Sequence, residues 1–175
     1  MQVALLRSHA AGVGPALGDE QVRAMLMLRA RTLAHGHSGV RVDVARRLVD
    51  LLRNDILPVV PAQGSVGASG DLAPFAHLAL PVIGEGMVRV GGVAMPAAEA
   101  LRAAGLEPLV LEPKEGLSLL NGTEGMLAML VLALDRAHVW HPFTQMKEHE
   151  ADPPIPVVGG EGPDLLLADG RRVLD

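Results

Sequence analysis

The chain has 175 residues and a net charge of −5, with 20 glycines, 13 prolines, 8 methionines, one Trp, two Phe and no Cys or Tyr. That length suits one ordinary domain, and a core of Ala, Leu, Val and Met favours packed helices over a β-sandwich. The negative charge disfavours a nucleic-acid partner, and the lack of cysteine excludes disulfides and thiolate metal ligands. No export signal is recognisable at the start, and the apolar run 126–134 is shorter than the roughly 20 residues of a membrane span. We expect a mostly α, cytoplasmic protein with no metal and no membrane.

The first part of the chain predicts helices separated by glycine and proline. Met1–Gly18 reads as the end of a helix followed by a Gly/Pro loop. A helix over Asp19–His35 begins with an acidic turn and stops at Gly36, and its many apolar positions predict that most of its circumference is buried. Asp43–Asn54 predicts an amphipathic helix, which Asp55–Pro61 ends with two prolines. The residues expected to face outward on this second helix are Arg46, Arg47, Asp50 and Arg53.

A glycine-rich segment follows at 64–74, reading Gly-Ser-Val-Gly-Ala-Ser-Gly-Asp-Leu-Ala-Pro. It does not fit a nucleophile elbow, because the residue two past Ser69 is Asp71 rather than Gly. It does not fit a Walker loop, because it contains no lysine. Asp71 falls at the N-cap of the next helix, where its carboxylate is expected to accept from backbone N–H groups of the first turn. One interpretation is therefore a glycine-rich connection capped by Asp71.

The middle of the chain predicts a helix over Leu72–Ile83, with Pro74 in its first turn and Pro81 ending or kinking it. His77 on this helix is interpreted as a packed or capped histidine rather than a base. A hairpin is expected over 86–96 around Gly91-Gly92. A short helix follows over 97–104, and a further buried helix is expected over 125–134.

The segment 64–74 resembles the prosthetic-group loop of the aromatic amino acid ammonia-lyases, and of the histidine ammonia-lyases in particular. In that family the Gly nitrogen attacks the Ala carbonyl and water is lost, including the Ser hydroxyl, which leaves the electrophilic ring 4-methylidene-imidazol-5-one (MIO). The resemblance implies that Ala68, Ser69 and Gly70 form MIO, and that Asp71 belongs to the catalytic site. It also implies a helical fragment of the ammonia-lyase fold.

Two further segments carry the same resemblance. The segment 8–14, Ser-His-Ala-Ala-Gly-Val-Gly, implies that His9 contacts the substrate, although a lone histidine is more often a surface or capped residue. The segment 114–124, Lys-Glu-Gly-Leu-Ser-Leu-Leu-Asn-Gly-Thr-Glu, implies that Asn121 contacts the ring or the substrate. Glu124 departs from the Gln that many relatives have at this place. The family motif also continues upstream of Met1, which predicts that the start is internal to a domain.

The resemblance covers about residues 2–134, and the charge changes after it. Residues 1–137 contain 12 basic and 13 acidic residues, whereas the remainder contains 3 and 7. We predict a partial ammonia-lyase helical domain over 1–136 and a second fragment over 137–175.

The second fragment resembles the N-terminal segment of the diaminopelargonate-type (adenosylmethionine-8-amino-7-oxononanoate) aminotransferases. The residues that carry this resemblance are Trp140–Met146 and Asp169–Asp175. Aminotransferase activity is not expected, because the family's Schiff-base lysine lies far downstream. Strands are predicted over 153–175, with a turn at Gly159-Gly160 and a hairpin at Asp169-Gly170.

Two functional interpretations remain open. The first is a histidine ammonia-lyase, which eliminates ammonia from L-histidine to give urocanate and forms homotetramers. The second is an inactive truncated or fused fragment, because the family uses tyrosines for proton abstraction and this chain has none. We expect the isolated chain to be oligomeric or poorly soluble, to have little activity, and to carry a mostly unmodified Ala68-Ser69-Gly70.

Overall fold

The structure is a computed structural model that describes residues 1–65, 70–138, 157–161, 164–167 and 172–174. The helices are α1 (Gln2–His9), α2 (Asp19–Ala34), α3 (Val42–Arg53), α4 (Leu72–Ala79), the 3-10 helix η1 (Leu80–Ile83), α5 (Ala97–Ala103), α6 (Glu115–Leu120) and α7 (Glu124–His138). The strands are β1 (Val13–Ala16), β2 (Leu57–Pro58), β3 (Pro61–Gln63), β4 (Met87–Val90), β5 (Val93–Pro96), β6 (Val157–Glu161), β7 (Asp164–Leu167) and β8 (Arg172–Leu174). The prediction of a mostly helical protein is confirmed.

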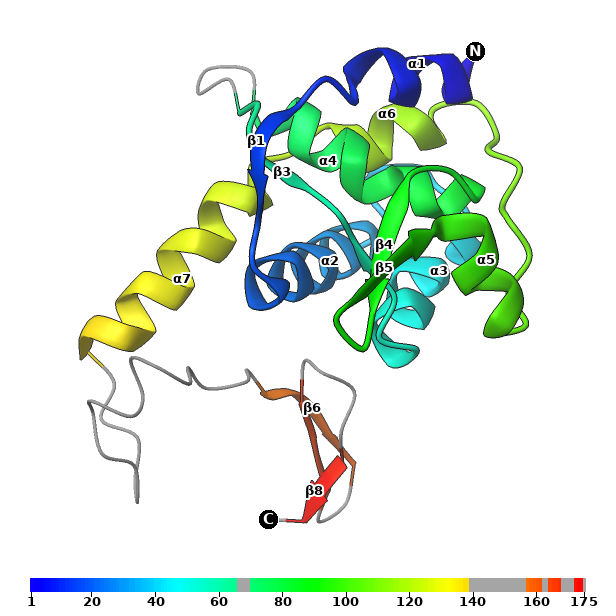
Figure 1. Ribbon diagram of the computed structural model, residues 1–175. Coiled ribbons are helices and arrows are strands. Elements are labelled where there is room, and N and C mark those ends of the chain that lie inside the picture. The colour runs from blue at the N-terminus through cyan, green and yellow to red at the C-terminus, as the bar shows by residue number, and fades with distance from the viewer. Residues whose placement is uncertain (66–69, 139–156, 162–163, 168–171, 175) are drawn as a thin grey trace.

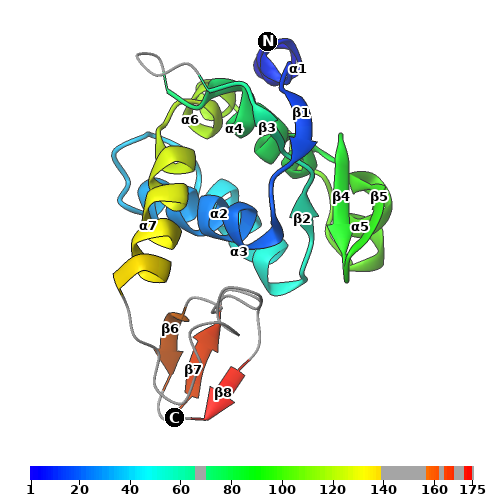
Figure 2. The same ribbon diagram turned by 60° about the vertical axis from the view of Figure 1, so that its left-hand side comes forward.

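Helix α2 is central to the packing, because it contacts both α3 and α7 (Figures 1 and 2). A second group consists of α1, α4 and α6, each of which contacts the other two. One hydrophobic core joins the groups, and its buried members include Leu6, Leu26, Leu48, Phe75, Leu119 and Ala128. Burial of such apolar side chains is the main source of stability for helices of this length.

The predicted helices and the hairpin are confirmed within a few residues. The helix predicted over Leu72–Ile83 is divided, because Pro81 lacks the N–H that an α-helix needs and the chain tightens into η1. In the hairpin, Gly91 and Gly92 have φ of 56° and 80°, as a tight turn between antiparallel strands requires.

Three short strands were not predicted. Strand β1 pairs with β3 through Val13↔Gln63 and Ala16↔Pro61, and β2 pairs with β4. These segments have the composition of loops, because strands of two to four residues that contain proline show no alternating pattern. The β1–β3 pair places the chain that follows α1 beside the chain that enters the segment 64–74.

Two arginines are buried, one of them against the prediction. Arg47 was expected to face outward from α3, but its side chain is buried and its Nη1 donates to the carbonyl oxygen of Glu107 (2.6 Å). Arg29 interrupts the apolar sequence of α2, yet it is only 2% exposed. A long aliphatic stem lets arginine enter a core when its guanidinium finds acceptors, and helical periodicity does not reveal such acceptors.

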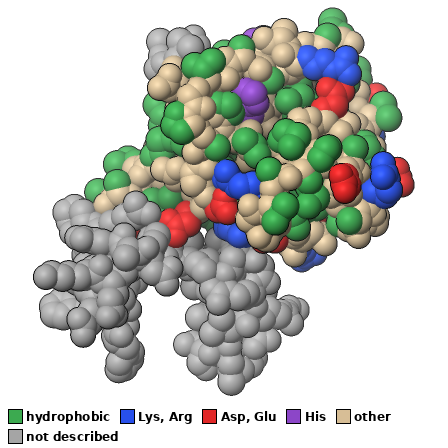
Figure 3. All heavy atoms as spheres, viewed as in Figure 1, with side chains coloured by type: hydrophobic (Ala, Val, Ile, Leu, Met, Phe, Trp, Pro, Cys, Tyr) green, Lys and Arg blue, Asp and Glu red, His purple; other side chains and the backbone are tan. Residues whose placement is uncertain are grey.

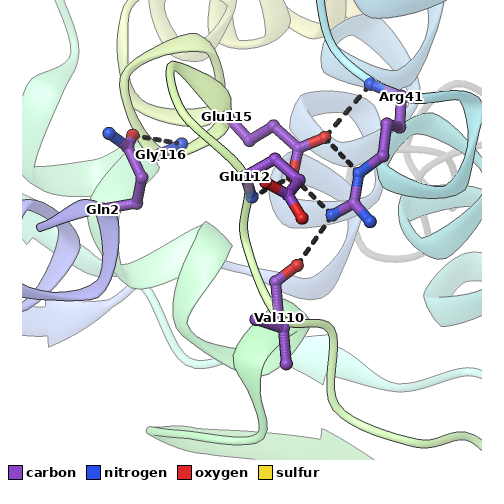
Figure 4. Close-up of polar contacts among 6 residues, drawn as sticks. All are labelled: Gln2, Arg41, Val110, Glu112, Glu115 and Gly116. Carbon is purple, nitrogen blue, oxygen red and sulfur yellow. Dashed lines mark hydrogen bonds and ion pairs between the residues drawn. The ribbon is translucent and has the colours of Figure 1, made fainter.

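An ion pair between Glu115 and Arg41 joins the start of α6 to the start of α3 (Figure 4). The Glu115 carboxylate accepts from Nε and Nη2 of Arg41 (both 2.8 Å) and from the backbone nitrogens of Arg41 (3.1 Å) and Glu112 (2.7 Å). Nη2 of Arg41 also donates to the carbonyl oxygen of Val110 (2.7 Å). These bonds, above all the side-chain bond from Arg41, lower the pKa of Glu115 to about 2.

Replacing Glu115 with Gln should lower the free energy of unfolding by about 1 to 3 kcal/mol at neutral pH, because the buried carboxylate loses the charge that strengthens its four hydrogen bonds. The pKa of Glu115 is lower in the folded than in the unfolded chain, so its contribution is present above about pH 4.5 and is lost as the pH falls toward about 2. Urea titrations across that range should show a shallower acid dependence in E115Q. The control is E112Q, whose side chain is exposed. An unchanged acid dependence in E115Q would contradict this assignment.

One face of α7 is apolar and exposed. Met126, Leu127, Leu130, Val131 and Leu134 are 41% to 54% exposed, whereas Ala128 and Leu132 are buried. Figure 3 shows apolar side chains at the surface over this helix. The prediction that the helix over 125–134 is buried therefore holds for one face only, because α2 covers only that face.

The stretch Glu115–Asp135 is long and apolar enough to cross a membrane by length and composition, a test that core helices of soluble proteins also pass. This stretch is longer than the apolar run 126–134 of the sequence analysis, because it also includes α6. In the structure, the segment 121–123 separates α6 from α7, and the buried Glu124 pairs with Arg29 at the first turn of α7.

The C-terminal strands form an antiparallel sheet in the order β6-β7-β8. The strands predicted over 153–175 are therefore present. The turn predicted at Gly159-Gly160 is wrong: both glycines lie within β6, next to a register irregularity that glycine accommodates. Asp169-Gly170 and Trp140–Met146 lie outside the described residues.

Candidate active site

Of the three residues predicted to form the ring, Gly70 is described, whereas Ala68 and Ser69 lie outside the described residues. Gly70 has φ of 98°, which side chains rarely allow. A Cβ built at this position would lie 2.7 Å from the carbonyl oxygen of Gly122. Residue 70 must therefore be glycine for two independent reasons, its backbone conformation and the close approach of the segment 121–123.

Asp71 is fully buried and links three parts of the chain. Its backbone N–H donates to the carbonyl oxygen of Gly122 (2.8 Å). Its carboxylate accepts from Oγ of Ser65 (2.6 Å) and from the backbone N–H of Met126 (3.0 Å). The residues on both sides of 66–69 are thereby fixed to each other and to the first turn of α7.

Asp71 does occupy the N-cap position of α4, but the predicted bond from its carboxylate to that helix is wrong. An N-cap side chain normally accepts from the second or third residue of its helix. The third residue of α4 is Pro74, which has no N–H. The carboxylate instead accepts from Met126, so it caps α7 rather than its own helix.

The predicted substrate-contact residues lie at the ends of two different helices. His9 ends α1, and its Nδ1 donates to the carbonyl oxygen of Leu5 (2.9 Å). Asn121 follows α6, and its side chain is exposed next to Gly122. Within the part of the chain that the structure describes, neither residue hydrogen-bonds to Gly70 or Asp71, and Nε2 of His9 and the Asn121 amide group have no partner.

His77 holds the segment after His9 against α4. Its Nε2 accepts from the backbone N–H of Gly12 (3.1 Å). Burial lowers the pKa of His77, so the neutral ring that this bond requires is favoured. The interpretation of His77 as a packed histidine is confirmed.

Sequence reasoning missed a buried ion pair beside the site. Nη2 of Arg29 donates to Oε2 of Glu124 (2.8 Å), and the two side chains are 2% and 12% exposed. The Arg29 guanidinium also lies 4.4 Å from the centre of the Phe75 ring. Burial lowers the pKa of Arg29, which the nearby carboxylates of Glu124 and Asp71 oppose. Glu124, which stands where many relatives have Gln, could have indicated this ion pair, because a carboxylate that is buried in an apolar helix needs a cationic partner.

No metal centre is evident among the described residues, where no three His, Asp or Glu side chains form a group that could hold an ion. The arrangement consists instead of backbone groups and one buried carboxylate around Gly70. It is suited to constraining a peptide.

Comparison with known proteins identifies the class. The family model "Aromatic amino acid lyase" matches residues 1–146, and the chain belongs to this family. The match extends past the boundary predicted after residue 136, so the division into two domains stays a prediction.

Curated relatives are histidine ammonia-lyases. The chain is 58% identical over 134 residues to "Histidine ammonia-lyase" of Sorangium cellulosum (strain So ce56), which covers 77% of this chain and 26% of the relative. It thus spans about a quarter of the length of the curated relatives that it matches.

Solved structures share the fold. The histidine ammonia-lyase of Trypanosoma cruzi has a TM-score of 0.72 at 40% identity, covering 78% of this chain and 27% of that one. A tyrosine aminomutase from Streptomyces globisporus has a TM-score of 0.71 at 45% identity, covering 78% and 25%. The fold is therefore shared by a lyase and an aminomutase.

Proposed function

We propose that this chain is a segment of a histidine ammonia-lyase, a carbon–nitrogen lyase that eliminates ammonia from L-histidine to give urocanate. The observation that carries the proposal is the contact of two residues with the Gly122 carbonyl: Gly70 approaches it closely, and the N–H of Asp71 donates to it. We call this pair of contacts the Gly122 clamp. Identities of 48% to 58% with curated histidine ammonia-lyases support the choice of substrate.

The prosthetic group proposed for the site is MIO, formed from Ala68, Ser69 and Gly70. In its formation the nitrogen of Gly70 bonds to the carbonyl carbon of Ala68, and two water molecules leave with the carbonyl oxygen of Ala68 and the hydroxyl of Ser69. When present, MIO supplies an electrophilic carbon that captures the substrate. The described residues fit this group, because the space beside Gly70 excludes any side chain and its conformation demands glycine.

The chain's own residues have distinct parts in this proposal. The Gly122 carbonyl fixes the peptide that follows the ring nitrogen, and Asp71 holds that peptide to Ser65 and α7. The N-terminus of α4, directly after Asp71, favours negative charge at the ring. His9 and Asn121 are the proposed substrate contacts, since each has a polar group free of partners within the described structure. No Tyr is available in this chain, so the group that removes the substrate proton is not assigned to it.

Assembly and location complete the proposal. We propose a cytoplasmic homo-oligomer of the tetrameric kind, in which the exposed apolar face of α7 is covered. Isolated apolar faces of this sort favour association. The segment 137–175 is proposed to be an aminotransferase-like N-terminal fragment, on the strength of the resemblance carried by Trp140–Met146 and Asp169–Asp175.

A second candidate is the inactive fragment, and the exposed face of α7 favours it for the isolated chain. A chimera separates the two candidates. In the Sorangium cellulosum relative, the matching segment is replaced by residues 2–134 of this chain. The chimera is given L-histidine, and the absorbance of urocanate is followed. The proposal predicts urocanate from the chimera and none from its Ser69→Ala variant. A chimera that folds and assembles like its parent but makes no urocanate would favour the inactive fragment.

A further inference from the structure

The guanidinium of Arg29 contacts three elements besides its own helix. From α2 it donates to Glu124 in the first turn of α7 (2.8 Å) and to the carbonyl oxygen of Ser118 in α6 (3.5 Å), and it covers the ring of Phe75 in α4 (4.4 Å to the centroid). These three elements flank Gly70 and the segment 121–123. Its remaining nitrogen, Nε, is buried without a partner in the described residues. A buried charge with an unsatisfied donor is costly unless the surrounding structure fixes it.

The ion pair is in contact with Gly122 itself. A Cβ built on Gly122 would overlap the Arg29 guanidinium and the Glu124 carboxylate, and would lie 2.7 Å from Cζ of Arg29. The carbonyl oxygen of the same residue accepts from the N–H of Asp71 (2.8 Å) and lies 2.7 Å from the position of a Cβ on Gly70. The Gly122 peptide is thus confined between the ion pair on one side and Gly70 on the other.

We propose that Arg29 and Glu124 are a positioning pair for the ring-forming loop. They press the Gly122 peptide against Gly70 and so hold Gly70 and the Gly70–Asp71 peptide in the conformation that presents the nitrogen of Gly70 for ring closure. A loop that must close on itself stays strained only where the surrounding structure fixes its conformation. The Arg29–Glu124 pair is buried and hydrogen-bonded, so it provides such a fixed surface behind the Gly122 peptide. The role of the pair in ring formation rests on the proposed function. Its restraint of the Asp71 amide does not depend on that function.

Amide hydrogen exchange of the full 175-residue chain, measured by mass spectrometry with fragmentation that resolves the Asp71 amide and tolerates oligomers, tests the pair. Ring closure consumes the N–H of Gly70 and leaves that of Asp71, so the Asp71 amide reports on the clamp whether or not the ring has formed. In R29M and E124L the acceleration of this amide should exceed that of core amides such as Leu48 by at least about tenfold, because core amides report the general loss of stability whereas the Asp71 amide also loses its local restraint. R29K should restore part of the protection, since a lysine supplies the charge without the planar fork.

Two control variants separate a local effect on the Asp71 amide from a general loss of stability. E124Q retains an oxygen that can accept from Arg29, so its effect should be smaller than that of E124L. L130Q alters an exposed residue of the same helix and should leave the Asp71 amide unchanged. An unchanged Asp71 amide in R29M and E124L, or equal acceleration of all amides, would overturn the proposal. The mass of the peptide containing Ser69 is recorded separately, because an unmodified loop counts against ring formation and not against the pair.

Discussion

Replacing Gly122 with Ala should lower the free energy of unfolding by about 3 to 5 kcal/mol, the range seen when a buried ion pair is broken. The added methyl group would occupy the space of the Arg29 guanidinium and the Glu124 carboxylate. These groups cannot retreat easily, because both are buried and the guanidinium is also held by Phe75 and Ser118. The pair must separate or the segment 121–123 must move. Urea denaturation followed by circular dichroism measures the change.

A matched glycine provides the control for this substitution. Gly18 has φ of −65°, and a Cβ there meets only Oε1 of Gln21 at 3.6 Å, so G18A should cost less than about 1 kcal/mol. The double variant R29A/G122A should be less destabilised than the sum of the single variants, because R29A already breaks the ion pair and removes part of the atoms that the methyl group would meet. Additive effects, or a G122A chain as stable as G18A, would show that the close packing around Gly122 is not as described.

Replacing Gly70 with Ala should abolish ring formation in the chimera and reduce urocanate production by at least about 100-fold, the scale on which small misplacements act at a reaction centre. The methyl group would meet the Gly122 carbonyl oxygen at 2.7 Å, and the φ of 98° is unfavourable for alanine. The Gly70–Asp71 peptide must then leave its present position. The Asp71–Gly122 hydrogen bond should be lost with it.

Gly105 allows the steric and conformational effects to be separated. It has φ of 68°, and a Cβ there meets nothing within 4 Å, so G105A introduces backbone strain without a clash. The chimera carrying G105A should retain the ring and its activity with a modest loss of stability. If the G70A chimera still lost the mass of two water molecules and still produced urocanate, the close approach of Gly122 would have no part in ring formation.

Much of the helical framework could be predicted from the sequence. Glycine and proline mark the ends of α2 and α4, and the apolar spacing of α3 gives its buried face. The strands β1, β2 and β3 could not be predicted in this way, because each depends on a partner distant in sequence. For the same reason, Gly159-Gly160 indicated a turn locally although pairing with β7 places both residues in a strand.

The site was predictable only in its residue types. The motif around Gly70 and Asp71 carries the chemistry, but the partners of Asp71 lie at positions 65, 122 and 126 and emerge only on folding. The bond expected from Asp71 to its own helix failed because of Pro74, which the sequence did contain. Arg29 and Glu124 lie 95 positions apart, and nothing in the periodicity of either helix pairs them.

The proposed prosthetic group depends most directly on the state of Ser69, and the mass of the proteolytic peptide that contains Ser69 measures this state. In the chimera, we expect a peptide lighter by two water molecules than its sequence, and an unmodified mass in the Ser69→Ala variant apart from the substitution. The isolated chain should show mostly the unmodified peptide, because the exposed face of α7 leaves its scaffold incompletely covered. A chimera that folds and assembles with its Ser69 peptide at full mass would contradict the proposal that this loop forms MIO.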